Sequence, residues 1–509
     1  MTLILVNLPS AATTATGATE SFISGQKRRM TPDQYYSLPI EHLGLMSIAA
    51  YARSQGLCVE TVDGLVAGHA SVAETWNAID AIAQKSGPPM LIGFSAIDTF
   101  DEVRWLADRC RREWEGVRIA IGNTFATLNY ERILAGHDCF DFVVIGEGEV
   151  SFTLLAEALL DGTPVDKVPA LAWRQEDGCI RSTPVTAVDL DELPWPARDE
   201  LPTVLREGFA GAVFSTRGCL YRCTFCGTGA ASDLLGRNRY RTRSVQSVVD
   251  EIEYLIADFG VGFLSISDDL FLAKHPSMQA RAEEFASELI RRKLPLTFMI
   301  DARIDSVVDL KLFAHLRQAG LRRVFIGLET GSYEQLVSYR KRHTAQGEDP
   351  AARINALQEL GIEVIPGTIM FHPTVQPSEL RQTLRLLKAT GYRNPNKLLD
   401  RMTAYPGTPL YQEYAAKGLL TKDWPIGAWD FADRAAATFY QQLAGRIRHN
   451  EQITFEEAEE YFLTRLAEWD AMSAQPAADG LADGHAADDV LSLAVAGPRR
   501  YRGPGNAPA

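Results

Sequence analysis

The sequence lacks any long apolar run and has few cysteines for its length. No stretch of about eighteen consecutive apolar residues occurs in the 509 residues, so we expect no membrane span. Residues 1–7 carry neither a basic region nor a cleavage site and are typical of a first strand, which favours a cytoplasmic protein. The seven cysteines are odd in number. Four are scattered singly among apolar residues, and we expect them to fill the core in a reducing compartment: Cys58, Cys110, Cys139 and Cys179.

The sequence also has fewer positively than negatively charged residues. The chain has 51 Lys and Arg against 65 Asp and Glu, a net charge of −14, which argues against a nucleic-acid partner for the whole chain. One basic stretch, Arg237–Arg243, is expected to pair with internal carboxylates or with a ligand. The hydrophobic fraction of 46% is ordinary for a globular protein, and the length predicts about three or four domains.

A CxxxCxxC pattern is the most informative feature that is present. Cys219, Cys223 and Cys226 fit one tight loop, where three thiolates can hold three irons of a [4Fe–4S] cluster and leave the fourth iron open. A structural zinc site needs four protein ligands, and no fourth Cys or His lies within about twenty residues. A disulfide is not expected in a reducing compartment. The pattern therefore predicts an iron–sulfur cluster.

The first 165 residues alternate short β-rich runs with helical segments. This order is typical of a doubly wound, Rossmann-like parallel sheet, whose ligands lie beyond the carboxyl ends of the strands. The turns at those ends predict Gly122, Asn123, Gly146 and Glu147 as cofactor-binding residues. The expected strands are 3–7, 58–62, 90–95, 118–122 and 140–146, and the expected helices are 43–54, 72–85, 100–114 and 152–160. Residues 9–39 form a polar insert.

Residues 206–405 repeat the alternation six times, which predicts a partial (β/α)6 barrel with catalytic groups at the carboxyl ends of its strands. The expected strands are 211–215, 263–267, 297–300, 323–327, 363–370 and 397–403, and the expected helices are 245–259, 279–292, 306–319, 349–360 and 379–390. A hairpin and linker (166–205) precede this barrel, and a mainly helical domain (406–474) follows it and is placed to cap its mouth. Residues 475–509 are expected to be mostly disordered.

Several motifs at the strand ends resemble those of a known family. The cysteine pattern, with Phe225 before the last thiolate, resembles the radical S-adenosylmethionine (SAM) superfamily, and 325–332, 367–373 and 403–411 resemble that family's later strand ends. Residues 141–149 and 190–198 resemble the cobalamin-binding Rossmann domain that precedes the barrel in one subfamily. Over about residues 1–420 the chain thus resembles the cobalamin (B12)-binding-domain radical SAM proteins.

The resemblance implies three cofactors: a [4Fe–4S] cluster, SAM bound at its open iron, and cobalamin. It implies cluster ligation by the three cysteines and a set of cofactor-binding residues: Phe225, Gly227, Ser267, Asp268, Asp269, Arg303, Glu329 and Ser332. Adjacent aspartates on a strand point to opposite faces, so we expect only one of that pair to reach the site. The DxHxxG loop of the family is absent, so cobalamin is expected without a protein histidine on cobalt, unless the domain only supports the fold.

Three residues at the barrel mouth are the catalytic candidates: Tyr405, His372 and Arg303. Tyr405 is a candidate for stacking near the adenine or the cobalamin, or belongs to a structural exit from the barrel. His372 is a proton donor, a substrate contact or a packing residue. Arg303 pairs with a ligand carboxylate or forms a buried structural ion pair.

The reaction that the resemblance implies is radical methylation of an unactivated carbon or phosphorus of a small-molecule or natural-product substrate. Three alternatives stay open. They are a radical rearrangement, oxidation or cyclisation without methyl transfer, transfer of the 3-amino-3-carboxypropyl group of SAM to a nucleophile such as arsenic, and a catalytically silent cluster protein. The expected partners are the substrate and an electron donor such as flavodoxin or ferredoxin.

Overall fold

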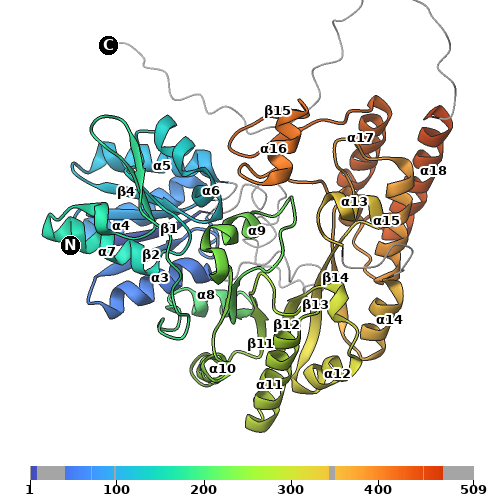
Figure 1. Cartoon of the computed structure of the whole chain (residues 1–509), viewed down its shortest axis with the longest axis horizontal. Helices are drawn as coiled ribbons and strands as arrows, with labels where there is room; N and C mark the ends of the chain where they lie inside the picture. The colour runs from blue at the N-terminus through green and yellow to red at the C-terminus, as the bar shows by residue number, and fades with distance from the viewer. Residues whose placement is uncertain are drawn as a thin grey trace, which may run out of the picture.

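Two sheets, one mostly parallel and one wholly parallel, dominate the structure, a computed structural model that describes residues 2–8, 41–69, 71–96, 99–342, 350–450 and 452–473. The predicted insert 9–39 and the predicted tail 475–509 lie outside the described residues. In Figure 1 the N-terminal sheet lies at the left, the second sheet at the lower right, and the C-terminal helices beside and above the second sheet. In the described ranges, no helix has both the length and the apolar character that crossing a membrane requires.

The N-terminal sheet confirms the predicted doubly wound fold. Its strand order is β2-β1-β3-β4-β5-β6-β7, parallel from β2 to β5 and antiparallel from β5 to β7. The predicted hairpin is thus part of this sheet. The strands are β1 Leu3–Asn7, β2 Val59–Asp63, β3 Leu91–Ser95, β4 Arg118–Gly122, β5 Phe142–Val144, β6 Leu171–Arg174 and β7 Ile180–Ser182. The helices around them are α3 Leu43–Ser54, α4 Val72–Ser86, α5 Phe100–Glu113, α6 Thr124–Gly136 and α7 Glu149–Asp161.

Helix α6 has no counterpart among the predicted helices. Its backbone leaves helical geometry at Asn129, whose side-chain amide donates to the Phe125 carbonyl at 2.8 Å. The buried residues come in two separate groups on either side of this kink, with no buried residue in the turn between them, so the apolar periodicity is weak. Sequence periodicity alone therefore misses the helix that follows β4.

The second sheet is wholly parallel, with strand order β14-β13-β12-β11-β8. Its strands are β8 Gly211–Val213, β11 Phe263–Ile266, β12 Thr297–Ala302, β13 Leu321–Glu329 and β14 Glu363–Thr368. Helices α10 Val245–Phe259, α11 Pro276–Arg292, α12 Leu310–Ala319, α14 Ala351–Glu359 and α15 Pro377–Ala389 follow the strands. The shorter elements are α8 Leu201–Arg206, α9 Gly227–Ser232, α13 Tyr333–Ser338 and the antiparallel pair β9 Thr216–Gly218 and β10 Tyr240–Thr242.

The predicted sixth barrel strand, 397–403, is wrong as a regular strand. A 3-10 helix covers Pro395–Leu399, and Asn394 caps it by accepting from the Asn396 amide. Only a single bridge joins Arg401 to Phe371 beyond β14. Proline at the start of this segment fixes a turning backbone, and this local preference shortens the sixth strand to one pair.

The two faces of the second sheet differ in character. One face joins the main apolar core under the helices, whereas Phe263, Met299, Phe325 and Ile365 pack together on the opposite face. Since side chains alternate along a strand, the residue two positions beyond Met299, Asp301, lies on that same face nearer the carboxyl ends. The barrel interior thus has an apolar floor and a polar upper layer.

The C-terminal part is more mixed than the predicted helical domain. It contains α16 Pro409–Ala416, the antiparallel strands β15 Leu420–Lys422 and β16 Ala428–Trp429, and α17 Arg434–Arg448 and α18 Phe455–Ser473. Trp424, beside this hairpin, packs against Phe100 and Phe125 of the N-terminal domain, with ring centroids 5.3 and 5.0 Å away. This segment therefore ties the barrel back to the first domain.

A buried ion-pair network joins the linker to both domains. Arg198 donates to Glu41 at 2.7 Å and to Glu251 at 2.5 Å, and Arg243 donates to the other oxygen of Glu251 at 2.5 Å. The prediction that the basic stretch pairs with internal carboxylates is confirmed for its described side chains: Arg239 pairs with Asp233, Arg241 with Glu147 and Arg243 with Glu251.

Glu200, at the start of α8, predicts a pH-dependent stability. Burial, together with Asp63, Asp199 and Glu41, raises its pKa from 4.5 to about 7. A raised carboxyl pKa gives stability that is present in full below 4.5 and lost as the pH rises to about 7. Glu200→Gln is therefore expected to be more stable than the parent at pH 8, by about 1–2 kcal/mol, and to lose this advantage near pH 5.

Urea unfolding of both proteins across that pH range measures the effect. The exposed Glu176 provides the control, because Glu176→Gln removes a carboxylate that is not buried. A stability difference for Glu200→Gln that does not change with pH would contradict the assignment.

Candidate functional site

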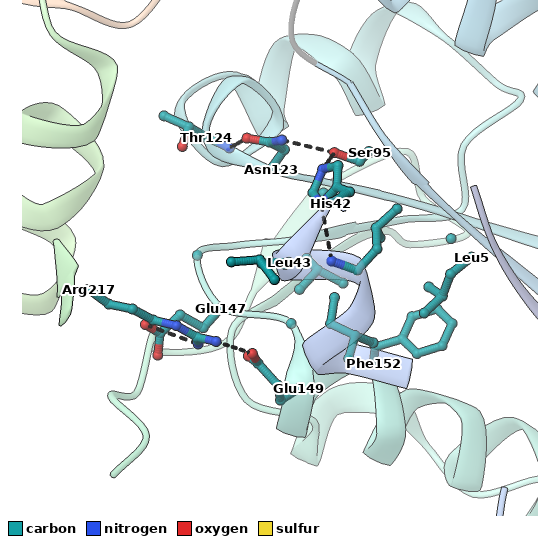
Figure 2. Close-up of a pocket in the computed structure, with 18 of the residues that line it drawn as sticks. Leu5, His42, Leu43, Ser95, Asn123, Thr124, Glu147, Glu149, Phe152 and Arg217 are labelled. Atoms are coloured by element: carbon teal, nitrogen blue, oxygen red, sulfur yellow. Dashed lines mark hydrogen bonds and ion pairs between the residues drawn. The ribbon is translucent and has the colours of Figure 1, made fainter. Parts of the chain in front are cut away.

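A cavity of about 440 Å³ opens between the carboxyl ends of the two sheets. Its walls come from β1, β3, β4 and β5 and from the first turns of α3 and α7, and its far side comes from the second domain. Figure 2 shows the N-terminal wall, with Arg217 reaching in from the opposite side. The predicted residues Gly122, Asn123, Gly146, Glu147, Ser267 and Asp269 all line this cavity.

The deep part of the cavity is apolar and closely packed. Leu5, Ile48 and Phe152 line it together with two glycines, Gly93 and Gly148. A Cβ at Gly93 would lie 2.8 Å from the Phe152 ring, and one at Gly148 would lie 2.5 Å from Ile48 Cδ1. Any larger side chain at either position would push an apolar wall residue out of place. The slot thus suits a flat apolar group.

A polar cluster closes one end of this slot (Figure 2). His42 Nδ1 accepts from the Leu45 amide at 3.2 Å, so its neutral ring carries the proton on Nε2, which donates to Ser95 Oγ at 2.8 Å. Asn123 Nδ2 donates to the same oxygen at 2.9 Å. Desolvation lowers the pKa of His42, which keeps the ring neutral. With both lone pairs engaged, the Ser95 hydroxyl is left as a donor.

The sequence analysis missed His42, because the residue lies after the polar insert and far in sequence from Ser95. Its position in the cavity does not conflict with the expected absence of a histidine on cobalt. Both ring nitrogens already have hydrogen-bonding partners, so neither is free to bind a metal without breaking one of these contacts.

The three cysteines of the predicted cluster lie on one loop between β9 and α9. All three thiols are free and partly exposed. Within the described part of the chain, no three His, Cys, Asp or Glu side chains converge on a single metal ion, so this loop is not a preformed mononuclear site. A cluster takes one thiolate for each of three irons, and this donor set fits that requirement.

Without a cluster, burial favours the neutral thiol at Cys219 and Cys223. Burial raises the pKa of Cys219 to about 11 and also raises the pKa of Cys223. Metal binding must therefore displace protons, as it does wherever thiols become thiolate ligands.

Contacts on both sides hold the cluster loop in place. The Thr224 amide donates to the Tyr339 carbonyl at 3.0 Å, and the Thr224 carbonyl accepts from the Leu410 amide at 2.8 Å. The Phe225 ring meets Tyr339 edge to face, with centroids 5.2 Å apart. The Arg303 guanidinium lies 3.7 Å from the Tyr221 ring centroid and pairs with Asp305 at 3.0 Å. Arg303 thus packs on the loop between the first two cysteines.

The adjacent aspartates after β11 point in different directions, in keeping with the alternation expected of a strand. Asp268 is buried and accepts from the Ser215 amide at 2.6 Å, the Ser215 hydroxyl at 2.5 Å and the Thr216 amide at 2.8 Å. Its carboxylate therefore holds the chain that enters β9. Asp269 lines the cavity instead and accepts from Thr228 Oγ1 at 2.9 Å.

The end of β13 brings an ion pair into the barrel interior. Glu329 accepts from Lys341 Nζ at 2.5 Å, and a Cβ at Gly327 would lie 2.4 Å from that nitrogen, so glycine makes room for the pair. Glu329 itself has a positive φ of 62°, which side chains other than glycine rarely adopt. Such strain is typical of functional positions. Ser332, by contrast, caps α13 by accepting from the Gln335 amide at 3.3 Å.

Asp301 is a second residue that the sequence analysis did not single out. It lies one residue before the end of β12, on the interior face of the barrel. Desolvation and the nearby Asp268 and Asp269 raise the pKa of Asp301 well above its usual value, although Lys341 opposes the shift. The alternation of β12 could have identified it, since Met299 marks the interior face.

All three catalytic candidates, Arg303, His372 and Tyr405, lie outside the cavity walls just described. His372 is 5% exposed, and its Nε2 lies 3.3 Å from Glu379, which completes the capping box of α15. The Tyr405 carbonyl accepts from the Thr408 amide and hydroxyl at 3.1 and 2.8 Å, which shapes the turn before α16.

This same turn is a contact between domains. The Pro406 carbonyl accepts from Asn129 Nδ2 at 3.0 Å, and a Cβ at Gly407 would lie 2.6 Å from Leu128 Cβ on α6. Gly407 has φ +91°, so both its conformation and its contact require glycine. The motif at 403–411 thus docks the end of the barrel on the N-terminal domain.

The four scattered cysteines divide into two pairs. Cys110 and Cys139 are buried, as expected of core residues, but Cys58 and Cys179 are exposed. The core prediction is therefore wrong for the latter two. Cys58 precedes an edge strand and Cys179 follows the turn of the β6–β7 hairpin, so apolar neighbours in the sequence do not cover them.

Comparison with family models agrees with this two-part site. A model described as the radical SAM superfamily matches residues 213–387, and a model described as a B12 binding domain matches residues 36–156. The first match contains the cluster loop and the second contains most of the N-terminal cavity wall. Together they span both sides of the cleft.

Individual relatives extend the comparison. An uncharacterized methyltransferase of Pyrococcus horikoshii is 26% identical over 388 residues, which cover 75% of this chain and 80% of the relative. An anaerobic magnesium-protoporphyrin IX monomethyl ester cyclase of Synechocystis is 25% identical over 326 residues, covering 63% of this chain but only 62% of the relative.

The fold of this chain resembles that of a solved structure over most of the chain. The cobalamin-dependent S-adenosylmethionine radical enzyme OxsB, with aqua-cobalamin and S-adenosylmethionine bound, superposes with a TM-score of 0.68 at 18% identity. The match covers 92% of this chain and 71% of that one. At this identity the likeness concerns the fold alone.

Proposed function

Because this chain joins a B12-binding domain to a radical SAM domain and is related to the cobalamin-dependent radical SAM enzymes, we propose that it is a radical SAM methyltransferase. Its substrate is a small molecule or natural product with an unactivated carbon or phosphorus. The single observation that supports this proposal best is the cleft itself. One continuous cleft has the cavity of the B12-binding domain on one side and the radical SAM barrel on the other.

The two domains imply a [4Fe–4S] cluster, SAM and cobalamin as cofactors. When bound, the cluster supplies the electron that cleaves SAM, and cobalamin serves as the carrier of the methyl group. Cys219, Cys223 and Cys226 would hold the cluster. Phe225 would shield it on the barrel side, and Gly227 would let α9 approach the N-terminal domain, since a Cβ there would lie 3.1 Å from Thr124.

The cavity of the N-terminal domain would hold cobalamin. The apolar slot would take the flat nucleotide base of cobalamin. The turns at Gly122 and Gly146 would pass close to cobalamin because glycine carries no side chain. Asn123 would act through Ser95, whose hydroxyl it orients. Glu147 would act by fixing Arg217 at the mouth of the cavity.

SAM would lie between the cluster loop and the barrel interior. Ser267 and Asp269 lie at the end of β11 and line the cleft. We assign Asp269 to hydrogen-bond donors of SAM or of the substrate, and Asp268 to positioning the chain before the cluster loop. Glu329 would accept from the ribose hydroxyls or the amino group of SAM. Ser332 would act by capping the N-terminus of α13.

The catalytic candidates receive narrower roles in this proposal. Arg303 would position the cluster loop by packing on Tyr221. Tyr405 would set the turn that docks the barrel on α6. His372 would serve packing at the start of α15 through Glu379. The electron donor would be a small redox protein such as flavodoxin or ferredoxin.

A second candidate function is a radical cyclisation or oxidation without methyl transfer. The observation that favours it is the cyclase of Synechocystis, which matches at nearly the same identity as the methyltransferase of Pyrococcus horikoshii. Both reactions would use the same cleft, so the geometry does not separate them.

The products formed from SAM distinguish the candidate reactions. Protein loaded anaerobically with cluster and hydroxocobalamin is incubated with SAM and a chemical reductant, and the products are resolved by mass spectrometry. A methyltransferase is expected to yield both S-adenosylhomocysteine and 5′-deoxyadenosine. 5′-Deoxyadenosine alone would favour the cyclase-like reaction, and methylthioadenosine would indicate aminocarboxypropyl transfer and overturn the proposal.

A further inference from the structure

Two carboxylates beyond β5 hold an arginine that belongs to the hairpin before the cluster loop. Arg217 precedes Cys219 by two residues, and its Nη2 donates to Glu149 at 2.5 Å. Its Nη1 lies 3.6 Å from Glu147, and Nη2 also donates to Ser47 at 3.2 Å. Glu147, Glu149 and Ser47 all belong to the N-terminal domain. Figure 2 shows the arginine reaching these carboxylates across the cleft.

A second arginine of the same hairpin makes a parallel contact. Arg241 lies on β10, which pairs with β9, and Arg241 is the register partner of Arg217. Arg241 Nη1 donates to Glu147 at 2.9 Å and to the Val188 carbonyl at 2.7 Å. Both strands of the hairpin are therefore tied to one turn of the N-terminal domain. We call Glu147, Glu149, Arg217 and Arg241 the interdomain clamp.

The geometry of the clamp is restricted because its charged groups are removed from water. Glu149 is 2% exposed and Arg217 is partly buried, so each charge depends on its partner. Burial alone would raise the pKa of Glu149, but the Arg217 guanidinium and its hydrogen bond hold the pKa below its usual value. The guanidinium also lies 4.5 Å from the Phe214 ring centroid.

We propose that the interdomain clamp couples occupation of the cobalamin cavity to ordering of the cluster loop. Glu147 and Glu149 line the cavity, and Arg217 lies on β9, the strand that leads to Cys219. A ligand that restrains the turn at Gly146–Glu149 therefore also restrains the start of the cluster loop. Thermodynamic linkage makes the effect mutual, so an ordered cluster loop strengthens cobalamin binding by the same factor. This inference rests on the proposed function, because it takes cobalamin as the ligand of the cavity.

Hydrogen exchange of the cluster-loaded protein tests the coupling. The backbone amides of residues 216–226 are followed by mass spectrometry with and without hydroxocobalamin, whose retention is measured first by absorbance of the desalted protein. Hydroxocobalamin is expected to slow exchange there by about fivefold or more, the lower range of allosteric coupling. Glu149→Gln is expected to bind hydroxocobalamin more weakly and, when saturated, to show less than about half of this slowing.

A matched control removes a carboxylate within one domain. Asp141, just before β5, pairs with Arg111 at 2.6 Å and Arg118 at 2.9 Å, both in the N-terminal domain. Asp141→Asn is expected to keep the full slowing. If Glu149→Gln does not fold, Arg241→Gln tests the same clamp at its less buried arm and is expected to reduce the slowing in the same direction.

Four results would overturn the coupling. Retained hydroxocobalamin with unchanged exchange in the parent protein would reject it and leave the proposed function intact. Full slowing in both clamp variants would show that the clamp does not carry the effect, and an equal loss in Asp141→Asn would assign the effect to general stability. A protein that retains no hydroxocobalamin would instead reject the proposed use of cobalamin, and the coupling with it.

Discussion

Cys223→Ala is expected to empty the cluster site and to abolish cleavage of SAM. Three thiolates hold three irons in the proposed site, and the two that remain in the variant are too few to retain the cluster. Iron and sulfide analysis after anaerobic reconstitution should fall from about four of each per chain to background. The same samples should form no 5′-deoxyadenosine from SAM.

Cys179→Ala is the matched control, because Cys179 is also a free cysteine but lies on the β6–β7 hairpin. This variant should keep the iron content and the SAM cleavage of the parent. A Cys223→Ala protein that retains a full cluster would show that the CxxxCxxC loop is not its binding site.

Gly93→Ala is expected to weaken cobalamin binding strongly. The added Cβ would lie 2.8 Å from the Phe152 ring and 2.9 Å from Leu5 Cδ2, and both side chains line the cavity. Overpacking of this kind costs about 1–3 kcal/mol, which corresponds to a roughly 5- to 150-fold higher Kd if the walls shift into the cavity. Titration of hydroxocobalamin followed by absorbance measures the Kd.

Gly136→Ala provides the control for this prediction. Gly136 ends α6, and a Cβ at that position would meet nothing within 4 Å. Its Kd should match the parent value, and thermal unfolding of both variants shows whether the fold is kept. An unchanged Kd in a folded Gly93→Ala protein would place cobalamin outside this slot.

Local sequence patterns predicted much of this fold because the interactions that place its helices, strands and turns are local. Apolar runs and turn residues placed α3 and α10 at the observed bounds, and the spacing of the three cysteines placed them on one loop. Strand alternation also predicted that Asp268 and Asp269 point to different faces. Which of the two faces the cleft depends on how β11 sits in the sheet, and that information is not local.

The misses arise where tertiary contacts override periodicity. Helix α6 bends at Asn129, whose side chain bonds both to its own helix and to the Pro406 carbonyl 277 residues away. His42 joins the site through Ser95, 53 residues further along the chain. The sixth strand is reduced to one bridge after a proline-started turn. None of these arrangements has a repeating signal in the sequence.

The family-like motifs have a structural explanation that the residues alone did not supply. Glu147 and Glu149 hold the hairpin before the cluster loop, Arg198 joins Glu41 to Glu251, and Gly407 docks on α6. These motifs were read from the sequence as cofactor turns or connectors. In the structure they also form contacts between the two domains.

The most direct test of the account is a count of both cofactors in one protein molecule. The chain is loaded anaerobically with iron, sulfide and hydroxocobalamin and desalted, and its iron and cobalt are counted. A mild reductant then converts the Co(III) of hydroxocobalamin to paramagnetic Co(II), and electron paramagnetic resonance is recorded before and after a stronger reductant reduces the cluster. The account predicts about four irons and one cobalt per chain, with the cobalt signal broadened when the cluster is reduced. Loss of cobalt on desalting while iron remains, or two signals that do not influence each other, would contradict a shared cleft.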